Sequence, residues 1–403
     1  MDLIVGTGLA AVRAVEALRE AGSSEPIIMV GSERVLPYDR PPLSKAFLRG
    51  ETTLAETLIH EADFYAAQRV ELDLGVAARA LRVSTRTVEL EDGRELRFDK
   101  LLIATGAEPR TLSVPGAHLD GVATLRTGAD ALRLKTELAR AERLVVVGGG
   151  LIGLEVAAVA RTAGKSVTVI EAARQPMARL LDVEQVASAV ADLHREHGAV
   201  VRTQTTVTEL RGAGRVEEVI LSTGERTPAD LVLVAIGVKP ALGWLEGSGL
   251  HLDDGVLTDD HLQTNVPGIF AAGDVARAFN PLLGREVRFE SYGSAQEQGA
   301  VAGRAMAGRL AVANILPSAG SEQYGARLQI LGTVGGAGRV LVRGSFAQRS
   351  FVAFFLVDGA VRGAFLMNRA RDLPAVRRLV AQRVPIDERR IADEAEPIAA
   401  AIP

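Results

Sequence analysis

Two glycine-rich segments are the residues of this chain best suited to chemistry. The first reads Gly6-Thr7-Gly8-Leu9-Ala10-Ala11, and the second reads Gly148-Gly149-Gly150-Leu151-Ile152-Gly153. In such segments the first glycine permits a tight turn, the second lets the backbone approach a pyrophosphate, and the third position, where Ala11 is an accepted substitute, packs the next helix on a strand. The amino end of that helix stabilises the phosphate charge. One such motif alone is weak support, but two of them predict two bound dinucleotides.

The elements around both glycine segments are those that this chemistry requires. Over residues 3–30 and again over 144–170, a short β-branched run precedes the glycines, and a helical pattern and a second apolar run follow them. This order of strand, helix and strand occurs twice. The sequence therefore predicts two βαβ units and two nucleotide-binding domains.

An acidic residue after the second strand of such a unit binds a ribose hydroxyl. Glu171 has this position in the second unit. Its carboxylate repels the 2′-phosphate of NADPH and favours NADH, although the nearby Arg174 and Arg179 leave NADPH open. In the first unit the position falls on Ser32 or Glu33, and we prefer the charged Glu33.

Three further strands end in small residues. Residues 264–274 end in Gly273-Asp274, which resembles the second flavin fingerprint of flavoproteins with two dinucleotides, whose aspartate accepts hydrogen bonds from the ribityl chain. The strands 101–106 and 231–237 end in Ala104-Thr105-Gly106 and Ile236-Gly237, like the crossovers between the FAD and NAD domains of such proteins. Each strand alone could be an ordinary buried strand, but together with the glycine motifs their order makes coincidence improbable.

These motifs define the expected domains. We predict a discontinuous FAD-binding domain over 1–107 and 238–310, an inserted NAD-binding domain over 108–237, and a C-terminal α+β domain over 311–403. The fold class is α/β, with two Rossmann-like domains arranged as in glutathione reductase.

The segment Leu36-Pro37-Tyr38-Asp39-Arg40-Pro41-Pro42-Leu43-Ser44-Lys45 is the most specific one in the chain. With the motifs above, it resembles the FAD-containing, NADH-dependent ferredoxin reductases that serve bacterial oxygenases and cytochromes P450, which are relatives of apoptosis-inducing factor. The resemblance covers essentially the whole chain. It implies an enzyme that takes hydride from NADH onto FAD and passes electrons one at a time to a small iron–sulfur ferredoxin.

The resemblance also implies residue roles. Lys45 would lie near the reactive centre of the flavin, and Glu155 would hold the nicotinamide end, so these two are the expected catalytic residues. Glu155 is flanked by apolar neighbours and therefore needs a partner, which makes a Lys45–Glu155 pair beside the flavin our hypothesis. The cofactor-binding set also includes Arg126 and Asp274 on FAD and the backbone of Glu290 to Tyr292 at the flavin pyrimidine edge. In full, the predicted cofactor-binding residues are Gly6, Gly8, Leu9, Ala10, Ser32, Glu33, Arg40, Lys45, Val76, Ala104, Thr105, Gly106, Arg126, Gly148, Gly150, Leu151, Ile152, Gly153, Glu155, Glu171, Arg179, Ile236, Gly237, Gly273, Asp274, Glu290, Ser291 and Tyr292.

The composition excludes several alternatives. The 403 residues contain no cysteine, so the chain has no disulfide, no redox cysteine and no Cys-bound cluster, and reduced flavin must deliver electrons directly to an outside acceptor. The net charge of −4 argues against a globally basic nucleic-acid binder. We expect no metal site, and we interpret His194 and His197 as surface residues. The sequence shows no targeting signal or membrane span, so we expect a cytoplasmic protein.

The C-terminal region carries the expected partner surface and a departure from the family pattern. Between Val361 and Arg390 there are eight arginines and three acidic residues, which fits docking of a small acidic [2Fe-2S] ferredoxin, with a solvated helix face as the alternative. An aromatic-rich family stretch is represented here by Ser318-Ala319-Gly320-Ser321-Glu322-Gln323, without its aromatic residues. That loss keeps two other functions open: an NADH oxidase or diaphorase-like reductase that uses oxygen or quinones, and an NADH-sensing flavoprotein. We expect a monomer or weak dimer.

Overall fold

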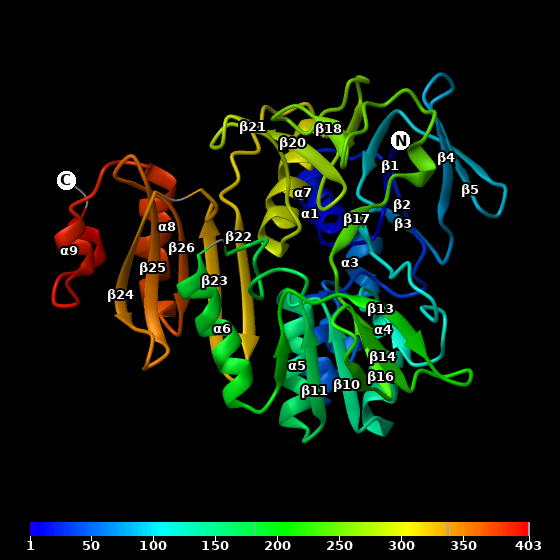
Figure 1. Cartoon of the computed structure of the whole chain (residues 1–403). Helices are drawn as coiled ribbons and strands as arrows, with labels where there is room; N and C mark the ends of the chain where they lie inside the picture. The colour runs from blue at the N-terminus through cyan, green and yellow to red at the C-terminus, as the bar shows by residue number, and fades with distance from the viewer. Residues whose placement is uncertain (182, 337, 402–403) are drawn as a thin grey trace. The chain divides into compact units, whose positions relative to one another are not determined.

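The chain divides into two units, each built from three separate stretches (Figure 1). Unit 1 consists of Met1–Asp39, Thr53–Glu108 and Val238–Pro317, and unit 2 consists of Arg40–Thr52, Pro109–Gly237 and Ser318–Pro403. The computed structural model describes residues 1–181, 183–336 and 338–401.

A five-stranded parallel sheet with the order β19-β7-β1-β2-β3 forms the centre of unit 1. Helix α1 (Leu9–Glu20) packs on this sheet and on α7 (Tyr292–Met306). The two helices approach so closely that a Cβ atom at Gly299 would lie 2.2 Å from the carbonyl oxygen of Ala10. The strands are β1 (Asp2–Val5), β2 (Ile27–Gly31), β3 (Val70–Leu74), β7 (Lys100–Ile103) and β19 (Ile269–Ala271).

Smaller elements complete unit 1. Two three-stranded sheets have the orders β4-β5-β6 and β18-β20-β21, and β8 pairs with β17. The bounds are β4 (Ala78–Arg82), β5 (Thr87–Leu90), β6 (Glu95–Arg97), β8 (Ala107–Pro109), β17 (Val238–Pro240), β18 (Val256–Thr258), β20 (Ala276–Asn280), β21 (Arg285–Arg288) and α3 (Ala62–Ala67).

Unit 2 contains the second parallel sheet, with the order β12-β11-β10-β16-β9. Helix α5 (Leu151–Thr162) lies beside β10 and β11, as Figure 1 shows in teal, and its first turn follows the second glycine segment. The other bounds are β9 (Val122–Ala123), β10 (Arg143–Val147), β11 (Ser166–Ile170), β12 (Val200–Arg202), β13 (Val207–Arg211), β14 (Glu218–Leu221), β15 (Arg226–Pro228), β16 (Leu231–Val234), α2 (Ala46–Arg49), α4 (Gly128–Arg140) and α6 (Glu184–Glu196).

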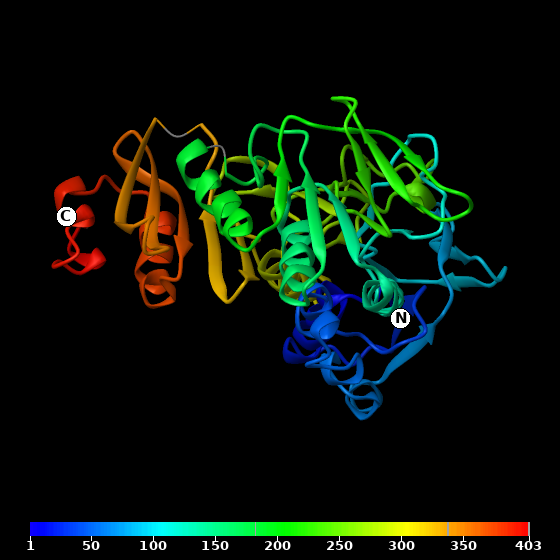
Figure 2. The same cartoon turned by 60° about the horizontal axis from the view of Figure 1, so that its bottom comes forward.

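The C-terminal part of unit 2 is an antiparallel sheet with the order β22-β23-β26-β25-β24. Helix α8 (Leu373–Gln382) packs on β26, as Figure 2 also shows. The remaining bounds are β22 (Ser318–Gln323), β23 (Ala326–Gly332), β24 (Arg339–Ser345), β25 (Ser350–Val357), β26 (Ala360–Met367) and α9 (Glu388–Ala392).

The predicted fold class is confirmed: two Rossmann-like sheets are followed by a C-terminal α+β segment. The helices after the glycine segments begin at Leu9 and Leu151, each directly after the second glycine of its G-x-G-x-x-G/A motif, Gly8 and Gly150. The proposed three-domain division stays a prediction. Within the described ranges, no helix is long and apolar enough to cross a membrane.

Candidate functional site

The first glycine segment forms a tight cradle at the carboxyl end of β1. Gly6 has a φ of +116°, and a Cβ atom there would lie 2.1 Å from the carbonyl oxygen of Ala104, so only glycine fits. Gly8 caps α1 without a side-chain hydrogen bond, and the first turn of α1 contains no acidic residue. The amino end of α1 therefore presents backbone N–H groups and positive potential without a competing carboxylate.

The other motifs of unit 1 meet this cradle because neighbouring parallel strands end together. Val5, Ile103 and Ala271 are in register on β1, β7 and β19. The residues after these strands therefore lie at one edge of the sheet, which brings Ala104-Thr105-Gly106 and Gly273-Asp274 to the glycine turn. A Cβ atom at Gly273 would lie 3.2 Å from that of Ala10.

The remaining predicted residues of unit 1 differ in their surroundings. Glu33 is half-buried and accepts a hydrogen bond of 2.5 Å from the Tyr38 hydroxyl, whereas Ser32 is exposed. Val76 contributes its side chain to the apolar core. At the start of α7, Ser291 accepts a hydrogen bond from the Ser294 backbone, and Glu290 pairs with Arg288 at 2.9 Å. Tyr292 is 42% exposed, and partial desolvation of its hydroxyl together with the nearby Asp39 carboxylate raises the Tyr292 pKa.

The second glycine segment forms a matching cradle in unit 2. Gly148 has a φ of +108°, and a Cβ atom there would lie 2.3 Å from the carbonyl oxygen of Ala235. A Cβ atom at Gly153 would lie 2.2 Å from the carbonyl oxygen of Gly148, so the third glycine holds α5 against the turn. Gly150 caps α5 without a side-chain hydrogen bond, and the first helical turn contains no acidic residue.

Glu171 lies beside this cradle, directly after β11. Its two carboxylate oxygens accept hydrogen bonds from the backbone N–H groups of Gly149 and Ala173, each at 2.7 Å. A carboxylate has further lone pairs, so Glu171 can still accept hydrogen bonds from ribose hydroxyls. Ile152 and Ile236 near the glycine turns are 41% and 37% exposed, and Arg179 is also exposed.

The hypothesised Lys45–Glu155 pair is present in unit 2. Glu155 is on α5 and only 4% exposed, and its Oε2 accepts a hydrogen bond from Lys45 Nζ at 2.8 Å. The same oxygen accepts a second hydrogen bond from the Ser44 hydroxyl. The other oxygen, Oε1, accepts one from the Ser321 hydroxyl at 2.7 Å. These three donors compensate the cost of burying the carboxylate.

Arg40 and Arg126 are also brought together in unit 2. The Arg40 guanidinium donates a hydrogen bond of 3.0 Å to the carbonyl oxygen of Arg126. Thr127 then begins α4 with a capping box, in which Asp130 accepts from the Thr127 backbone, so the loop that carries Arg126 is anchored at its end.

The interpretation of His194 as a surface residue is wrong. Its side chain is fully buried on α6, and burial lowers the His194 pKa to about 4. His197, by contrast, is exposed. His194 Nε2 lies 2.9 Å from Gln323 Oε1, so a polar partner on β22 makes burial of the imidazole tolerable.

Sequence reasoning missed Ser44, Ser321 and Gln323 as neighbours of the predicted site. One signal was available: residues 321 and 323 are two apart on a strand and therefore face the same side. The stretch that had lost its aromatic residues thus retained two polar side chains on one face.

The two cradles fit adenine dinucleotides. Both exclude every side chain larger than glycine at the turn, and both helices begin without a side-chain cap. Comparison with known families agrees with this chemistry. Residues 3–299 match the family "Pyridine nucleotide-disulphide oxidoreductase", and residues 320–402 match "Reductase C-terminal".

Individual relatives match almost the full chain. The ferredoxin–NAD(+) reductase component of the anthranilate 1,2-dioxygenase system of Burkholderia cepacia is 40% identical over 97% of this chain and 96% of its own length. Putidaredoxin reductase of Pseudomonas putida is 36% identical over 98% and 95% of the two chains.

Solved structures show the same fold. The chain matched in the covalent putidaredoxin reductase–putidaredoxin complex has a TM-score of 0.96 and 36% identity, with 100% and 97% of the two chains covered. The ferredoxin reductase for the CYP199A2 system of Rhodopseudomonas palustris also has a TM-score of 0.96, with 33% identity and 99% of each chain covered. The chain therefore belongs to the pyridine nucleotide-disulphide oxidoreductase family, among the ferredoxin reductases of oxygenase and cytochrome P450 systems.

Proposed function

We propose that this protein is an NADH-dependent ferredoxin reductase with FAD in the unit 1 cradle and NADH in the unit 2 cradle. The observation that carries this assignment is the presence of two glycine cradles with uncapped helices in a chain without cysteine. Bound FAD accepts a hydride from NADH and releases electrons singly, which is chemistry that the protein itself does not supply. Because the chain contains no cysteine, no thiol relays those electrons to the acceptor.

Glu155 and Lys45 are the side chains to which we assign the nicotinamide end of this site. The Glu155 carboxylate holds the Lys45 ammonium at 2.8 Å, so the cation has a fixed position although Lys45 itself is 20% exposed. A fixed ammonium group stabilises negative charge that develops next to it during hydride transfer. Glu171 supplies the carboxylate for the ribose of NADH.

Replacing Glu155 with Gln tests this assignment. The variant retains the shape of the side chain but removes the charge that holds Lys45, and a hydrogen bond to a charged group contributes about 1.5–3 kcal/mol. We expect flavin reduction by NADH to slow about tenfold or more in anaerobic stopped-flow, with the FAD content unchanged. Glu184→Gln, on the exposed surface of α6, is the matched control. Unchanged reduction rates in Glu155→Gln would refute the role.

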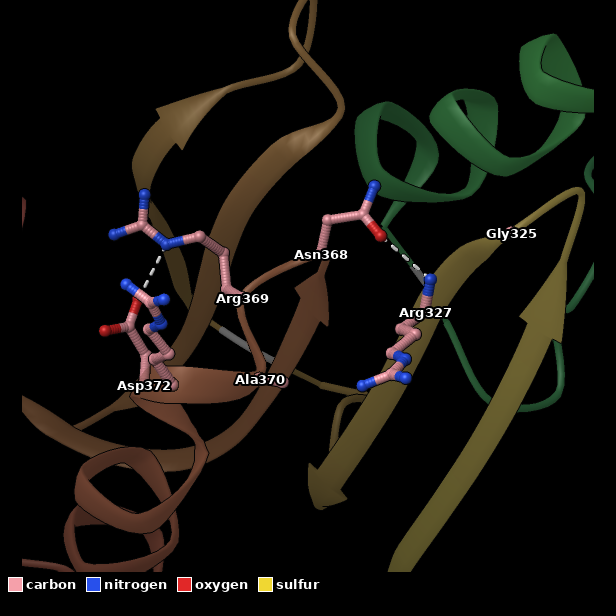
Figure 3. Close-up of a pocket in the computed structure, with 7 residues that line it drawn as sticks. Gly325, Arg327, Asn368, Arg369, Ala370 and Asp372 are labelled. Carbon is pink, nitrogen blue, oxygen red and sulfur yellow. Dashed lines mark hydrogen bonds and ion pairs between the residues drawn. The ribbon is translucent and has the colours of Figure 1, made fainter.

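The Arg-rich C-terminal region is the surface to which we assign an acidic [2Fe-2S] ferredoxin. A hollow of about 560 Å³ in this region is lined by Arg327, Arg369, Arg371 and a single acid, Asp372 (Figure 3). Asp372 forms an ion pair with Arg369, with Oδ2 2.6 Å from the Arg369 Nε. Arg327 and Arg371 are exposed and form no ion pair with any residue that the structure describes, so they can receive carboxylates of a partner.

The rest of the Arg-rich surface extends this charge. Of the eight arginines that the sequence places here, those at 371, 377, 378, 389 and 390 are exposed, so their charge is accessible to a partner as well as to solvent. Arg390 lies 3.8 Å from Asp387, so its charge is partly compensated. We propose a small, transient interface, as is usual for electron transfer.

Charge reversal in the hollow tests the docking surface. We expect Arg371→Glu to raise the KM for an acidic ferredoxin severalfold and to leave ferricyanide reduction unchanged. Rising salt should slow ferredoxin turnover of the wild type and affect the variant less. Arg211→Glu, at an exposed arginine of β13, is the control for a general change of charge. Equal salt dependence with both acceptors would contradict the docking surface.

A second candidate function rests on the missing aromatic residues. Ser318 and Gly320 stand where the family stretch has aromatic side chains, and Gly320 is exposed, so the surface around β22 differs from the family pattern. If this alters the electron exit, oxygen or a quinone is the alternative acceptor. Anaerobic reduction with NADH, followed by exposure to air, a quinone or a ferredoxin–cytochrome c pair, distinguishes these acceptors by the rate at which the flavin is reoxidised. A reduced flavin that persists with all three would instead support an NADH sensor. We also propose a cytoplasmic location and a monomer or weak dimer as the expected state.

A further inference from the structure

A continuous chain of buried hydrogen bonds leads from Glu155 to His194. Ser321 Oγ lies 2.7 Å from Glu155 Oε1, and Gln323 Nε2 lies 3.1 Å from Ser321 Oγ. Gln323 Oε1 lies 2.9 Å from His194 Nε2, and the Tyr324 hydroxyl lies 3.3 Å from His194 Nδ1. The chain therefore connects α5, β22 and α6 within unit 2.

The direction of every bond in this chain follows from its first member. An ionised carboxylate only accepts hydrogen bonds, so the Ser321 hydroxyl donates to Glu155, and the Gln323 amide NH2 group donates to Ser321. The remaining Gln323 oxygen must then accept from His194, so Nε2 of His194 carries a proton. Because the ring is fully buried and no acidic group contacts it among the described residues, the charged imidazolium is disfavoured, and His194 is the neutral Nε2–H tautomer. Its Nδ1 is left to accept from Tyr324. In this arrangement every contact pairs one hydrogen-bond donor with one acceptor.

The residues of this hydrogen-bond chain are almost completely buried. His194 and Gln323 are fully buried, Glu155 is 4% exposed and Ser321 is 9% exposed. Polar groups at such positions require all their partners, because an unpaired buried donor or acceptor is costly. The Tyr324 ring also stacks on the His197 ring, with the ring centres 3.9 Å apart, which anchors the far end.

We propose that Ser321, Gln323 and His194 are positioning residues that orient the Glu155 carboxylate and thereby fix the Lys45 ammonium. Glu155 Oε2 accepts hydrogen bonds from Lys45 and Ser44, whereas Oε1 accepts one from Ser321. The Ser321 hydroxyl therefore determines how the carboxylate plane is turned toward Lys45. Gln323 fixes that hydroxyl, and His194 fixes the Gln323 amide. This inference rests on the proposed function, in which Glu155 and Lys45 act at the nicotinamide.

The central test is a double-mutant cycle between Ser321→Ala and Glu155→Gln. If Ser321 acts through Glu155, Ser321→Ala alone should slow flavin reduction about tenfold and should cause little further loss when Glu155 is already Gln. The dissociation constant for NAD⁺, measured by calorimetry, should change less than twofold, because the glycine cradle is intact. Ser318→Ala, on the opposite face of β22, is the matched control and should behave like the wild type.

The outcomes separate this inference from the proposed function. A normal rate in Glu155→Gln would refute the role of Glu155 itself. A slow Glu155→Gln with a normal Ser321→Ala would refute only the positioning role, and so would losses that multiply in the double variant. If Ser321→Ala does not retain FAD, Gln323→Met replaces it in the cycle, with a severalfold loss expected.

A measurement on the unmodified holoenzyme tests the chain independently of activity. Nitrogen-15 NMR of the histidine rings should find one ring, assigned by its absence in His194→Gln, as the neutral Nε2–H tautomer at pH 7. An Nδ1–H tautomer or a charged imidazolium at this position would overturn the proposed order of hydrogen bonds.

Discussion

Replacing Glu171 with Gln should change the choice between NADH and NADPH. In the native chain both carboxylate oxygens accept backbone hydrogen bonds at 2.7 Å, from Gly149 and Ala173. A glutamine can accept only one of them, and its NH2 group would face the other N–H. Losing a hydrogen bond to a charged acceptor costs about 1.5–3 kcal/mol. The backbone around Gly149 and Ala173 should therefore be less firmly held, and the affinity for NADH should fall.

The same change removes a repulsion that acts on NADPH alone. Two unit charges about 4 Å apart interact by about 1 kcal/mol in water and about 4 kcal/mol near a protein surface. Glu171 is half-buried, so we take about 1–2 kcal/mol for its repulsion of the 2′-phosphate. This corresponds to about a tenfold gain for NADPH relative to NADH, before the loss of NADH affinity is added.

The assay is the ratio of kcat/KM for NADPH and NADH, with ferricyanide as the acceptor. We expect the ratio to rise at least tenfold in Glu171→Gln, with the FAD content unchanged. Glu225→Gln, at an exposed carboxylate that pairs with Arg202, controls for the loss of one negative charge. A ratio within twofold of the wild type would refute the assignment of Glu171 to the ribose.

Three further predictions concern the cradle, the C-terminal segment and His194. Gly6→Ala should lower the ratio of bound FAD to protein severalfold, because its Cβ atom would overlap the Ala104 carbonyl; absorbance at 450 nm of the purified protein measures this, and full FAD loading would contradict it. Arg343→Ala should expose the segment after residue 387 to proteolysis, because the buried guanidinium donates to four backbone carbonyl oxygens there, and an unchanged cleavage pattern would exclude this role. The His194 pKa is lowered to about 4 from 6.5, so protonation favours the unfolded chain, and the free energy of unfolding should fall by about 3 kcal/mol as pH decreases from 6.5 to 4. Urea denaturation at pH 7 and pH 5 should show a smaller decrease in His194→Gln than in the wild type; equal decreases would disprove the contribution of His194.

The local motifs allowed much of the fold to be predicted from the sequence. The turns at Gly6 and Gly148 have φ angles of +116° and +108°, which other residues adopt only with strain. Because such turns require glycine, the glycine pattern in the sequence was enough to predict them. Parallel strands in register then bring the ends of β7 and β19 to the same edge, which is why Gly273-Asp274 could be connected with a motif more than two hundred residues earlier.

The polar surroundings of Glu155 could not be predicted in the same way. The need for a partner followed from its apolar neighbours, and the resemblance suggested Lys45, but the second oxygen is held by Ser321 from another sheet. The prediction that His194 is a surface residue was wrong for a related reason. Helix α6 has an apolar face, and whether His194 on it is covered depends on where β22 lies in three dimensions. Such contacts depend on packing between distant segments and leave no periodic signal.

The interleaving of three stretches in each unit constrains how the protein can be made. Helix α1 is complete once 20 residues are synthesised, yet the helix it packs against, α7, ends only at Met306. At about 5–20 residues per second, a ribosome needs on the order of tens of seconds to supply that partner. During this interval the nascent chain carries an uncovered apolar face on α1, and a chain that stops before α7 leaves that face without its helical partner. Expression at low temperature or with added chaperone should therefore benefit the first unit most.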